Sequence, residues 1–405
     1  MKILIYGLNY YPEIVGTGKY TTELAEYLSI KNNKVRIITA NPYYPQWKAK
    51  KNFFRKEKIR NCTIFRSPIF VPKNPNGLKR IIHLLSFSLS SIPNLLCQIT
   101  WGPDLIIVVI PTILISQNIL FLKFLLGKKC KIWLHIQDFE IDAAQKLGIL
   151  KLSFLNQILK NYERFIYSNF DDISTISKDM QIKLKNKITN NINPKIIRNW
   201  IDTKNINENL KKNILYKKFK KELNISEKDI VVMYSGSLNK KQDVDLLINT
   251  IKSFPKKKFI KWILSIQGLS KNKIINELSP LKNVIITGLQ PTNILDTWLS
   301  IADIHLLPQK KNVSKLVMPS KLIGILASGR PVVISTTKDT ELGKIANKAG
   351  IATKPGDTKD FSNAIYKLCK DKNLRNKLGK NAHQIVYKYY DKEKILNNFL
   401  KDIEI

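Results

Sequence analysis

Short apolar runs alternate with longer segments of helical periodicity throughout the first half of the chain. The runs lie at 3–6, 35–39, 105–109, 131–135 and 172–175, and most are rich in Ile, Leu and Val. Runs of this length are typical of strands that are buried on both faces of a parallel sheet. The helical segments between them, the first at about 18–29, would cover those faces. The pattern therefore predicts a doubly wound α/β domain.

The second half repeats this pattern. Its apolar runs lie at 229–236, 262–266, 284–286, 304–307 and 332–334, and residues 361–405 have helical periodicity alone. Glycines stand at or just after several strand ends, namely Gly236, Gly268 and Gly288. We therefore predict an α/β protein of two Rossmann-like, doubly wound domains that face a cleft, because ligands bind such sheets at the carboxyl ends of their strands.

The polar segment 205–221 is interpreted as an interdomain connection or an exposed helix. We assign residues 1–208 and 390–405 to the N-terminal domain and 209–389 to the C-terminal domain. The last segment must pack on another element, because its apolar residues recur at helical spacing. The apolar stretch 114–126 is too short to cross a membrane and is predicted to be a buried helix. The segment 2–7 predicts a strand and a glycine turn, not a signal peptide.

Composition leaves several classes of partner open. Lys and Arg number 68 against 31 Asp and Glu, a formal net charge of +37, which suits nucleic acid, an anionic membrane or a nucleotide substrate. The basic residues are dispersed and mostly lysine, so biased codon usage is an equal explanation. The four cysteines lie far apart with no Cys-x-x-Cys pair. We therefore expect a reducing cytoplasm and no metal site.

The segment 318–334 combines features of an anion site. Pro319 suits the first turn of a helix, and Gly329 would end that helix before the strand at 332–334. The helix start would present free backbone N–H groups, the Ser320 hydroxyl and the Lys321 ammonium together, which suits a phosphate or diphosphate. The alternative is an ordinary capped core helix.

Two strand-to-helix loops carry further candidate anion-binding residues. The first contains Gly16, Thr17 and Gly18, where glycine permits close approach of a ligand to the backbone. The second contains Gly236 and Ser237, with Lys241 shortly after them. The alternatives are a plain turn in the first loop and a solvated lysine pair in the second.

His135 and Asp138 are the candidate catalytic residues. His135 lies at the end of a buried strand and Asp138 follows it closely. A histidine in that place can bind a hydroxylated substrate or transfer a proton. The alternative is a histidine that is hydrogen-bonded for structural reasons.

These segments recur in an order that resembles the family-4 retaining glycosyltransferases of the GT-B architecture. Within that family the chain looks most similar to the colanic-acid and O-antigen fucosyl- and N-acetylfucosaminyl-transferases. The most specific matching segments are Pro42-Tyr43-Tyr44-Pro45-Gln46-Trp47 and Met318-Pro319-Ser320-Lys321-Leu322. Others are 5–13 with 16–21, 134–138, 175–177, 198–200, 234–236 and 241–242, so the resemblance runs nearly end to end.

The resemblance implies a retaining transfer of a sugar, possibly of fucose or N-acetylfucosamine type, from a nucleotide-sugar donor in the C-terminal domain. The acceptor would be a lipid-linked or polysaccharide glycan of capsule, exopolysaccharide or O-antigen synthesis, held by the N-terminal domain. The final helix of the chain would cross back from the C-terminal to the N-terminal domain. No cofactor and no obligatory metal are implied. Lys241 matches the lysine beside the donor diphosphate, and His135 matches the histidine at the donor sugar. Gly16 and Gly18 match the glycine loop facing the phosphates.

Two departures from the family are clear. Ser237 stands where the family often has an arginine, and Leu316 and Gly324 stand where it has paired glutamates. We therefore hypothesise that Ser320 and Lys321 take over the neutralisation of charge. Two other functions stay open: a nucleotide-sugar 2-epimerase of the same architecture, and a non-catalytic polyanion binder. No helix-turn-helix or aromatic-interleaved basic motif favours nucleic acid as a partner.

Residues 71–85 suggest peripheral attachment to the anionic inner face of the cell membrane. Lys73, Lys79 and Arg80 could meet lipid headgroups, at about 1 kcal/mol each. The apolar residues expected to enter the interface are Ile81, Leu84, Leu85 and Phe87. The alternative is a core helix with a solvated basic start.

Overall fold

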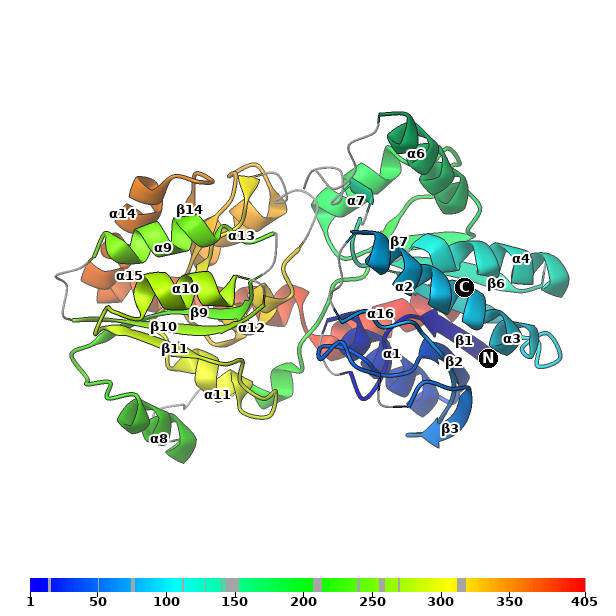
Figure 1. Cartoon of the computed structure of the whole chain (residues 1–405), viewed down its shortest axis with the longest axis horizontal. Helices are drawn as coiled ribbons and strands as arrows, with labels where there is room; N and C mark the ends of the chain where they lie inside the picture. Colours follow the sequence, from blue (N-terminus) through cyan, green and yellow to red (C-terminus); the bar gives the residue numbers. More distant parts are fainter. Residues whose placement is uncertain are drawn as a thin grey trace. The chain divides into compact units, whose positions relative to one another are not determined.

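The computed structural model describes residues 1–13, 16–49, 51–73, 77–110, 113–127, 129–139, 141–142, 153–206, 213–238, 241–254, 259–268, 270–311 and 318–404. It consists of two compact units, which we call the N-terminal and C-terminal units (Figure 1). The first comprises Met1–Asn199 with Leu396–Ile405, and the second comprises Trp200–Ile395. Each unit is a mostly parallel sheet with helices, so the predicted class of two α/β domains is confirmed.

The N-terminal unit has an eight-stranded sheet of order β3-β4-β2-β1-β5-β6-β7-β8. Its strands are β1 (Lys2–Gly7), β2 (Lys34–Ala40), β3 (Arg55–Ile59), β4 (Cys62–Ser67), β5 (Leu105–Ile110), β6 (Lys131–Ile136), β7 (Asp172–Thr175) and β8 (Lys195–Ile196). Its helices are α1 (Thr17–Ile30), α2 (Gly77–Ser90), α3 (Ile92–Leu96), α4 (Ser116–Leu126), α6 (Ser153–Ser168) and α7 (Lys178–Lys185). All strand pairs are parallel except β3 with β4.

The C-terminal unit has a six-stranded parallel sheet of order β11-β10-β9-β12-β13-β14. Its strands are β9 (Ile230–Ser237), β10 (Ile260–Gln267), β11 (Val284–Thr287), β12 (Ile304–Leu307), β13 (Val332–Ser335) and β14 (Gly350–Thr353). Its helices are α8 (Ile214–Glu222), α9 (Val244–Lys252), α10 (Lys271–Leu278), α11 (Leu295–Ser300), α12 (Lys321–Ala327), α13 (Glu341–Ala349), α14 (Thr358–Lys370) and α15 (Lys372–Tyr389). Trp262 lies fully buried in its core.

Both sheets reverse their strand order at one point. In the C-terminal unit the order runs outward from β9 in one direction and continues with β12 on the other side, which is the order of dinucleotide-binding folds. The equivalent point in the N-terminal unit lies between β1 and β5. Ligands of doubly wound sheets bind beyond the carboxyl ends of the strands at such a point.

The chain leaves the N-terminal unit at Asn199, ahead of the predicted boundary at 208, and α16 (Lys392–Glu404) brings it back. Phe399 of α16 packs edge-on against Trp133, with ring centroids 5.0 Å apart. Asp402 lies 3.4 Å from the Lys195 ammonium. The apolar stripe predicted for the last segment is thus buried, since Leu396, Phe399 and Ile403 are almost inaccessible.

The prediction of a buried helix at 114–126 is wrong. Ile119 and Leu122 of α4 are buried, but Phe121, Phe124 and Leu125 are 58%, 82% and 42% exposed. The helix is apolar on nearly every side, so its sequence could not show which face is covered. Among the described residues, no helix has both the length and the hydropathy required to span a bilayer.

Candidate functional site

Lys321 lies at the strand reversal of the C-terminal unit. The connection from β12 to β13 carries it at the start of α12, and its ammonium contacts the end of β9. The Nζ atom donates to the Tyr234 hydroxyl at 2.9 Å and lies 3.5 Å from the Ser237 carbonyl oxygen. It also lies 4.6 Å from the centroid of the Tyr234 ring, in cation–π geometry. The Tyr234 hydroxyl in turn donates to the Ser237 carbonyl oxygen at 3.1 Å.

Gly236 makes room for this lysine. Its φ of +141° is rare for L side chains, and a Cβ atom there would lie 2.5 Å from the Lys321 Nζ and 2.8 Å from its Cε. The sequence indicated Gly236 as a loop glycine beside a ligand. The structure places it within β9, one residue before the end of the strand, against the side chain of Lys321.

The electrostatics of this cluster favour an anion. Burial lowers the pKa of the Lys321 ammonium to about 8, because the protein replaces water around the charge. Within the described part of the chain no carboxylate pairs with this ammonium, whereas Lys252 and Lys273 of the same unit do have such pairs. A desolvated, uncompensated cation at a strand reversal gains stabilisation when an anion binds beside it.

The neighbouring candidates lie differently from the prediction. α12 begins at Lys321, two residues after Pro319, whose carbonyl oxygen accepts the Leu322 N–H at 3.0 Å. Pro319 therefore precedes the helix and does not form its first turn. Ser320 is exposed and its side chain makes no capping hydrogen bond, so its hydroxyl is accessible.

Lys241 lies on the second loop, next to the end of β12. Its carbonyl oxygen accepts the Lys310 N–H at 3.1 Å, and Gln242 pairs with Gln309 in an antiparallel bridge. These contacts hold the loop beside the strand reversal. Lys240 and Leu316 lie outside the described residues.

The two glycines of the first loop are explained by different structural features. Gly16 is exposed at the N-terminus of α1, with φ +59° and no atom within 4 Å of a built Cβ, so its backbone is open to a ligand. Gly18 is buried, and a Cβ there would lie 2.3 Å from the Glu13 carbonyl oxygen. Packing against Glu13 thus accounts for Gly18. The Thr17 hydroxyl donates to the Asn9 Oδ1 at 3.3 Å.

The buried carboxylate of Glu13 holds this loop in place, and it is not among the residues predicted for the site. The Glu13 Oε1 accepts the Tyr43 and Tyr44 N–H groups, both at 2.7 Å, and its Oε2 accepts from Asn9 at 2.7 Å. Desolvation raises the pKa of Glu13, and these hydrogen bonds oppose the rise. Glu13 therefore joins the two Tyr-Tyr segments, because its side chain binds Tyr43 and Tyr44 and its backbone N–H donates to the Tyr10 carbonyl oxygen at 3.0 Å.

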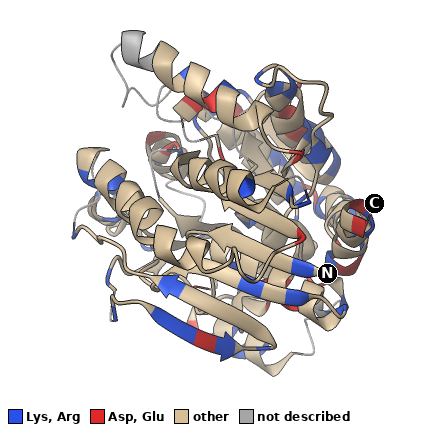
Figure 2. Ribbon diagram, turned by 90° about the vertical axis from the view of Figure 1, so that its right-hand side faces the viewer, with Lys and Arg blue, Asp and Glu red and all other residues tan. Residues whose placement is uncertain are grey.

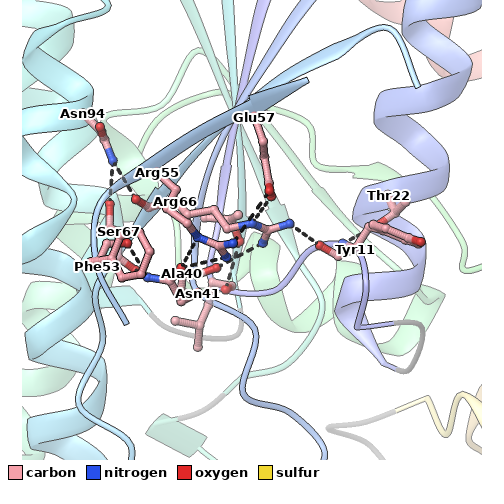
Figure 3. Close-up of polar contacts among 12 residues, drawn as sticks. Tyr11, Thr22, Ala40, Asn41, Phe53, Arg55, Glu57, Arg66, Ser67 and Asn94 are labelled. Carbon is pink, nitrogen blue, oxygen red and sulfur yellow. Dashed lines mark hydrogen bonds and ion pairs between the residues drawn. The ribbon is translucent and has the colours of Figure 1, made fainter. Parts of the chain in front are cut away.

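Arg66 also anchors this loop, through the Tyr11 carbonyl oxygen (Figure 3). It is 1% exposed on β4 and donates to the Tyr11 carbonyl oxygen at 2.6 Å, while its Nε contacts the Glu57 carboxylate of β3. Thr22 of α1 accepts the Tyr11 N–H at 2.9 Å. The unpredicted strand β3 therefore supplies the counter-charge for a residue that positions the glycine loop.

His135 is buried at the end of β6 and both its ring nitrogens have partners. Nδ1 lies 2.9 Å from the Ser174 Oγ and Nε2 lies 2.9 Å from the side-chain nitrogen of Gln137. Burial lowers the pKa of His135 to about 4, so the ring is neutral at physiological pH. Asp138 follows, half-buried, beyond the strand end. The sequence indicated His135 but not the side chains that surround it.

Stability should depend on the buried histidines as the pH falls. The pKa of His135 is about 4 and that of His305 about 3 in the folded protein, against 6.5 for the ordinary imidazole. Below pH 6.5 these histidines bind protons in the unfolded chain but not in the folded chain, so the free energy of unfolding declines. Each histidine should lower the free energy of unfolding by about 2 kcal/mol between pH 7.5 and 5. Urea titrations of wild type and of His305→Asn at both pH values test this. An equal pH dependence in the two proteins would contradict it.

α2 exposes one apolar stripe. Leu78, Ile81, Ile82, Leu85 and Leu89 are 71%, 46%, 44%, 37% and 64% exposed, and their spacing places them on one side of the helix. We call these five residues the α2 stripe. The only charged residues of α2 are Lys79 and Arg80, near its start. Figure 2 shows the blue Lys and Arg residues spread over many helices and strands. Phe87, predicted to enter a lipid interface, is 0% exposed, and Leu84 is only partly exposed.

The opposite side of α2 faces the Pro-Tyr-Tyr-Pro-Gln-Trp segment. His83 is buried there, with its ring centroid 4.7 Å from that of Tyr43 and 5.3 Å from that of Trp47. This aromatic packing fixes the rotation of α2 about its axis. The stripe is therefore exposed because the inner side is already occupied.

Comparison with known proteins agrees with this architecture. The family model described as glycosyl transferases group 1 matches residues 216–385. The Escherichia coli protein named putative colanic acid biosynthesis glycosyl transferase WcaI is 34% identical over 414 residues, covering all of both chains.

Solved structures share the fold over the whole chain. Sucrose-phosphate synthase from Thermosynechococcus elongatus superimposes with a TM-score of 0.78 at 15% identity, covering 100% of this chain and 98% of that one. HepE of Anabaena, solved in complex with UDP-glucose, gives a TM-score of 0.70 at 14% identity, covering 100% and 99%. The resemblance inferred from the motifs is confirmed: the chain belongs to the group 1 glycosyl transferases and is a glycosyltransferase of the GT-B fold.

Proposed function

We propose that this glycosyltransferase moves a sugar from a nucleotide-sugar donor to a lipid-linked glycan during synthesis of a bacterial surface polysaccharide. The observation that carries the donor assignment is the Lys321 ammonium, desolvated beside Gly236 at the strand reversal of the C-terminal unit. A diphosphate bound there would compensate its charge. Lys241 and the exposed Ser320 hydroxyl are further candidates for contacts with the same phosphates.

The relatives support both halves of the proposal. HepE was solved with UDP-glucose, and the Escherichia coli relative is named for colanic acid synthesis. By analogy we assign the donor to the nucleoside diphosphate sugars and the product to capsule, exopolysaccharide or O-antigen material. A sugar of fucose or N-acetylfucosamine type, and retention at the anomeric carbon, remain expectations from the family resemblance.

The departing diphosphate is the main charge that the enzyme must stabilise. In our proposal the Lys321 ammonium, Lys241 and the backbone N–H groups at the start of α12, all in the C-terminal unit, serve this purpose. These groups form an electrostatic alternative to a divalent cation. No cluster of three His, Cys, Asp or Glu suited to a metal occurs among the described residues.

Activity should therefore persist in excess EDTA. We expect the initial rate to change by less than about twofold, because protein cations and helix N-termini neutralise the leaving group. The measurement is release of nucleoside diphosphate with and without chelator, after removal of metal from enzyme and substrates. Loss of activity in EDTA that Mg²⁺ or Mn²⁺ restores would contradict this expectation.

The α2 stripe supports a lipid-linked acceptor. Five adjacent apolar side chains on one helix are unusual on a surface that faces water alone. Lys79 within α2, and Lys73 shortly before the helix in sequence, are exposed and could contact anionic headgroups. We propose peripheral docking on the cytoplasmic face of the cell membrane through this stripe, which would bring the N-terminal unit to its acceptor.

A donor screen tests the proposed function. Purified protein is incubated with UDP-, GDP- and dTDP-sugars, with and without membranes that contain lipid-linked glycans. We expect release of nucleoside diphosphate from one donor class only when the acceptor is present, with the sugar recovered in the lipid fraction. Interconversion of the donor without acceptor would instead identify a 2-epimerase, and no reaction with any donor would refute the proposal.

A further inference from the structure

A chain of five buried side chains connects β6 and β7 to the end of the N-terminal unit. The Trp133 Nε1–H donates to the Ser174 Oγ at 2.7 Å, and that oxygen lies 2.9 Å from the His135 Nδ1. The His135 Nε2 lies 2.9 Å from the Gln137 amide, and the amides of Gln137 and Asn199 bond to each other twice, both at 3.0 Å. All five residues are at most 7% exposed.

The positions of the protons in this network follow from the requirement that each buried polar group has a hydrogen-bond partner. Ser174 is 0% exposed, and its oxygen already accepts from Trp133, so its own proton needs an acceptor. Among the described residues the His135 Nδ1 is the acceptor in reach. The imidazole then carries its proton on Nε2, which requires an oxygen opposite it. Exchanging oxygen and nitrogen in the Gln137 and Asn199 amides supplies that oxygen and preserves both bonds between them.

In this arrangement one N–H of the Gln137 amide is not used in a hydrogen bond within the network. Its oxygen accepts from His135 and Asn199, and its nitrogen donates once to Asn199. Gln137 directly follows the last residue of β6, at the carboxyl end of the strand where ligands of such sheets bind. Gln137 and His135 are equally buried, at 7% and 6% exposure, but both ring nitrogens of His135 are engaged, whereas Gln137 retains an unused amide N–H.

We propose that His135 is a positioning residue and that Gln137 is the group that meets the substrate. The neutral Nε2–H tautomer of His135, with Asn199 on the other side, orients the Gln137 amide so that its remaining N–H can donate to a hydroxyl oxygen of the bound sugar. The identity of the ligand as a sugar rests on the proposed function. The tautomer and the orientation of the amide do not.

The tautomer can be measured without any substrate. The full chain is labelled with ¹⁵N in its four histidine rings, and the His135 signals are assigned by their loss in His135→Gln. We expect a neutral ring protonated on Nε2 from pH 5.5 to 8 in wild type. We expect the same in Gln137→Glu, whose carboxylate can still accept a hydrogen bond from the Nε2–H group. A His135 ring protonated on Nδ1 would overturn the proposal even if the protein transfers no sugar.

The activity of variants then separates positioning from proton transfer. His135→Gln retains an N–H donor near the place of Nε2, so we expect kcat/KM within about tenfold of wild type, whereas His135→Leu should lose roughly 100-fold. Gln137→Glu should remain folded but melt at a lower temperature, because a buried carboxylate replaces the N–H that Asn199 accepts. Its kcat/KM should fall at least about tenfold, since it cannot donate to the sugar. Equal inactivity of His135→Gln and His135→Leu, with both folded, would contradict the proposal. So would full activity of Gln137→Glu.

Discussion

Replacing Lys321 by methionine should lower kcat/KM by roughly 100-fold or more, the usual effect of removing one preorganised group that stabilises developing charge. The expected loss follows from the geometry at the end of β9, where the ammonium lies over Tyr234 and occupies the space left by Gly236. Methionine retains most of the length and packing of the side chain, but removes the charge and the hydrogen bond to Tyr234. Kinetics with saturating acceptor would show whether kcat falls together with kcat/KM.

The same substitution should leave the folded protein at least as stable as wild type. Burial lowers the pKa of Lys321, which means that the protein without ligand destabilises the charged form. Removing an uncompensated buried cation is therefore neutral or stabilising in the absence of donor. Lys348→Met, at an exposed position of α13, is the matched control and should change neither property. Nearly wild-type kcat/KM in Lys321→Met would refute the donor assignment.

Replacing Leu78, Ile82 and Leu85 of the α2 stripe by serine should abolish most membrane binding. Each of these exposed side chains would lose about 1 kcal/mol of burial in the lipid interface, so the triple variant should bind anionic vesicles roughly 100-fold more weakly. Folding should be unaffected, because the stripe faces away from the packed side that contains His83. Co-sedimentation with vesicles of phosphatidylglycerol and phosphatidylethanolamine measures the effect.

Two controls make this test specific. Ile214→Ser removes a side chain that is 84% exposed on α8 of the other unit, and should leave vesicle binding unchanged. Lys73→Glu with Lys79→Glu should weaken binding and its dependence on anionic lipid, more strongly at low salt. Arg80 is left intact because its charge acts on Tyr43, Tyr44 and His83. If wild type stays in the supernatant at low salt, the docking proposal is wrong.

The apolar runs predicted the parallel strands because burial on both faces leaves little choice of composition. The strands that escaped prediction, β3, β4, β8 and β14, lie at the edge of a sheet or next to it. In β4 the apolar residues are interrupted by Thr63 and Arg66. β3 alternates charged and partly buried residues, and β8 has two residues, so neither has an apolar run. β14 begins with Gly350 and is short and weakly apolar, so it has no apolar run either. Edge strands are specified by their partners more than by their own pattern.

The candidate site was predictable as far as single residues carry the chemistry. Lys321 and His135 could be found because a charge beside a helix start and a histidine at a strand end are local signals. The contacts between distant segments could not be found. Gly236 accommodates a side chain that is distant in sequence, Gly18 packs on the Glu13 backbone, and Asn199 meets Gln137 only after β6 and β8 join one sheet.

Calorimetric titration of nucleoside diphosphates at pH 8, in two buffers of different ionisation enthalpy, measures the donor site directly. The pKa of Lys321 is about 8 in the free protein, so half of the molecules carry an uncharged amine at this pH. A diphosphate beside Lys321 would raise that pKa, so binding should take up as much as about half a proton from the buffer. We predict this uptake for wild type, with weaker binding and no uptake in Lys321→Met. Binding of equal affinity in both proteins, without proton uptake, would show that the diphosphate binds elsewhere.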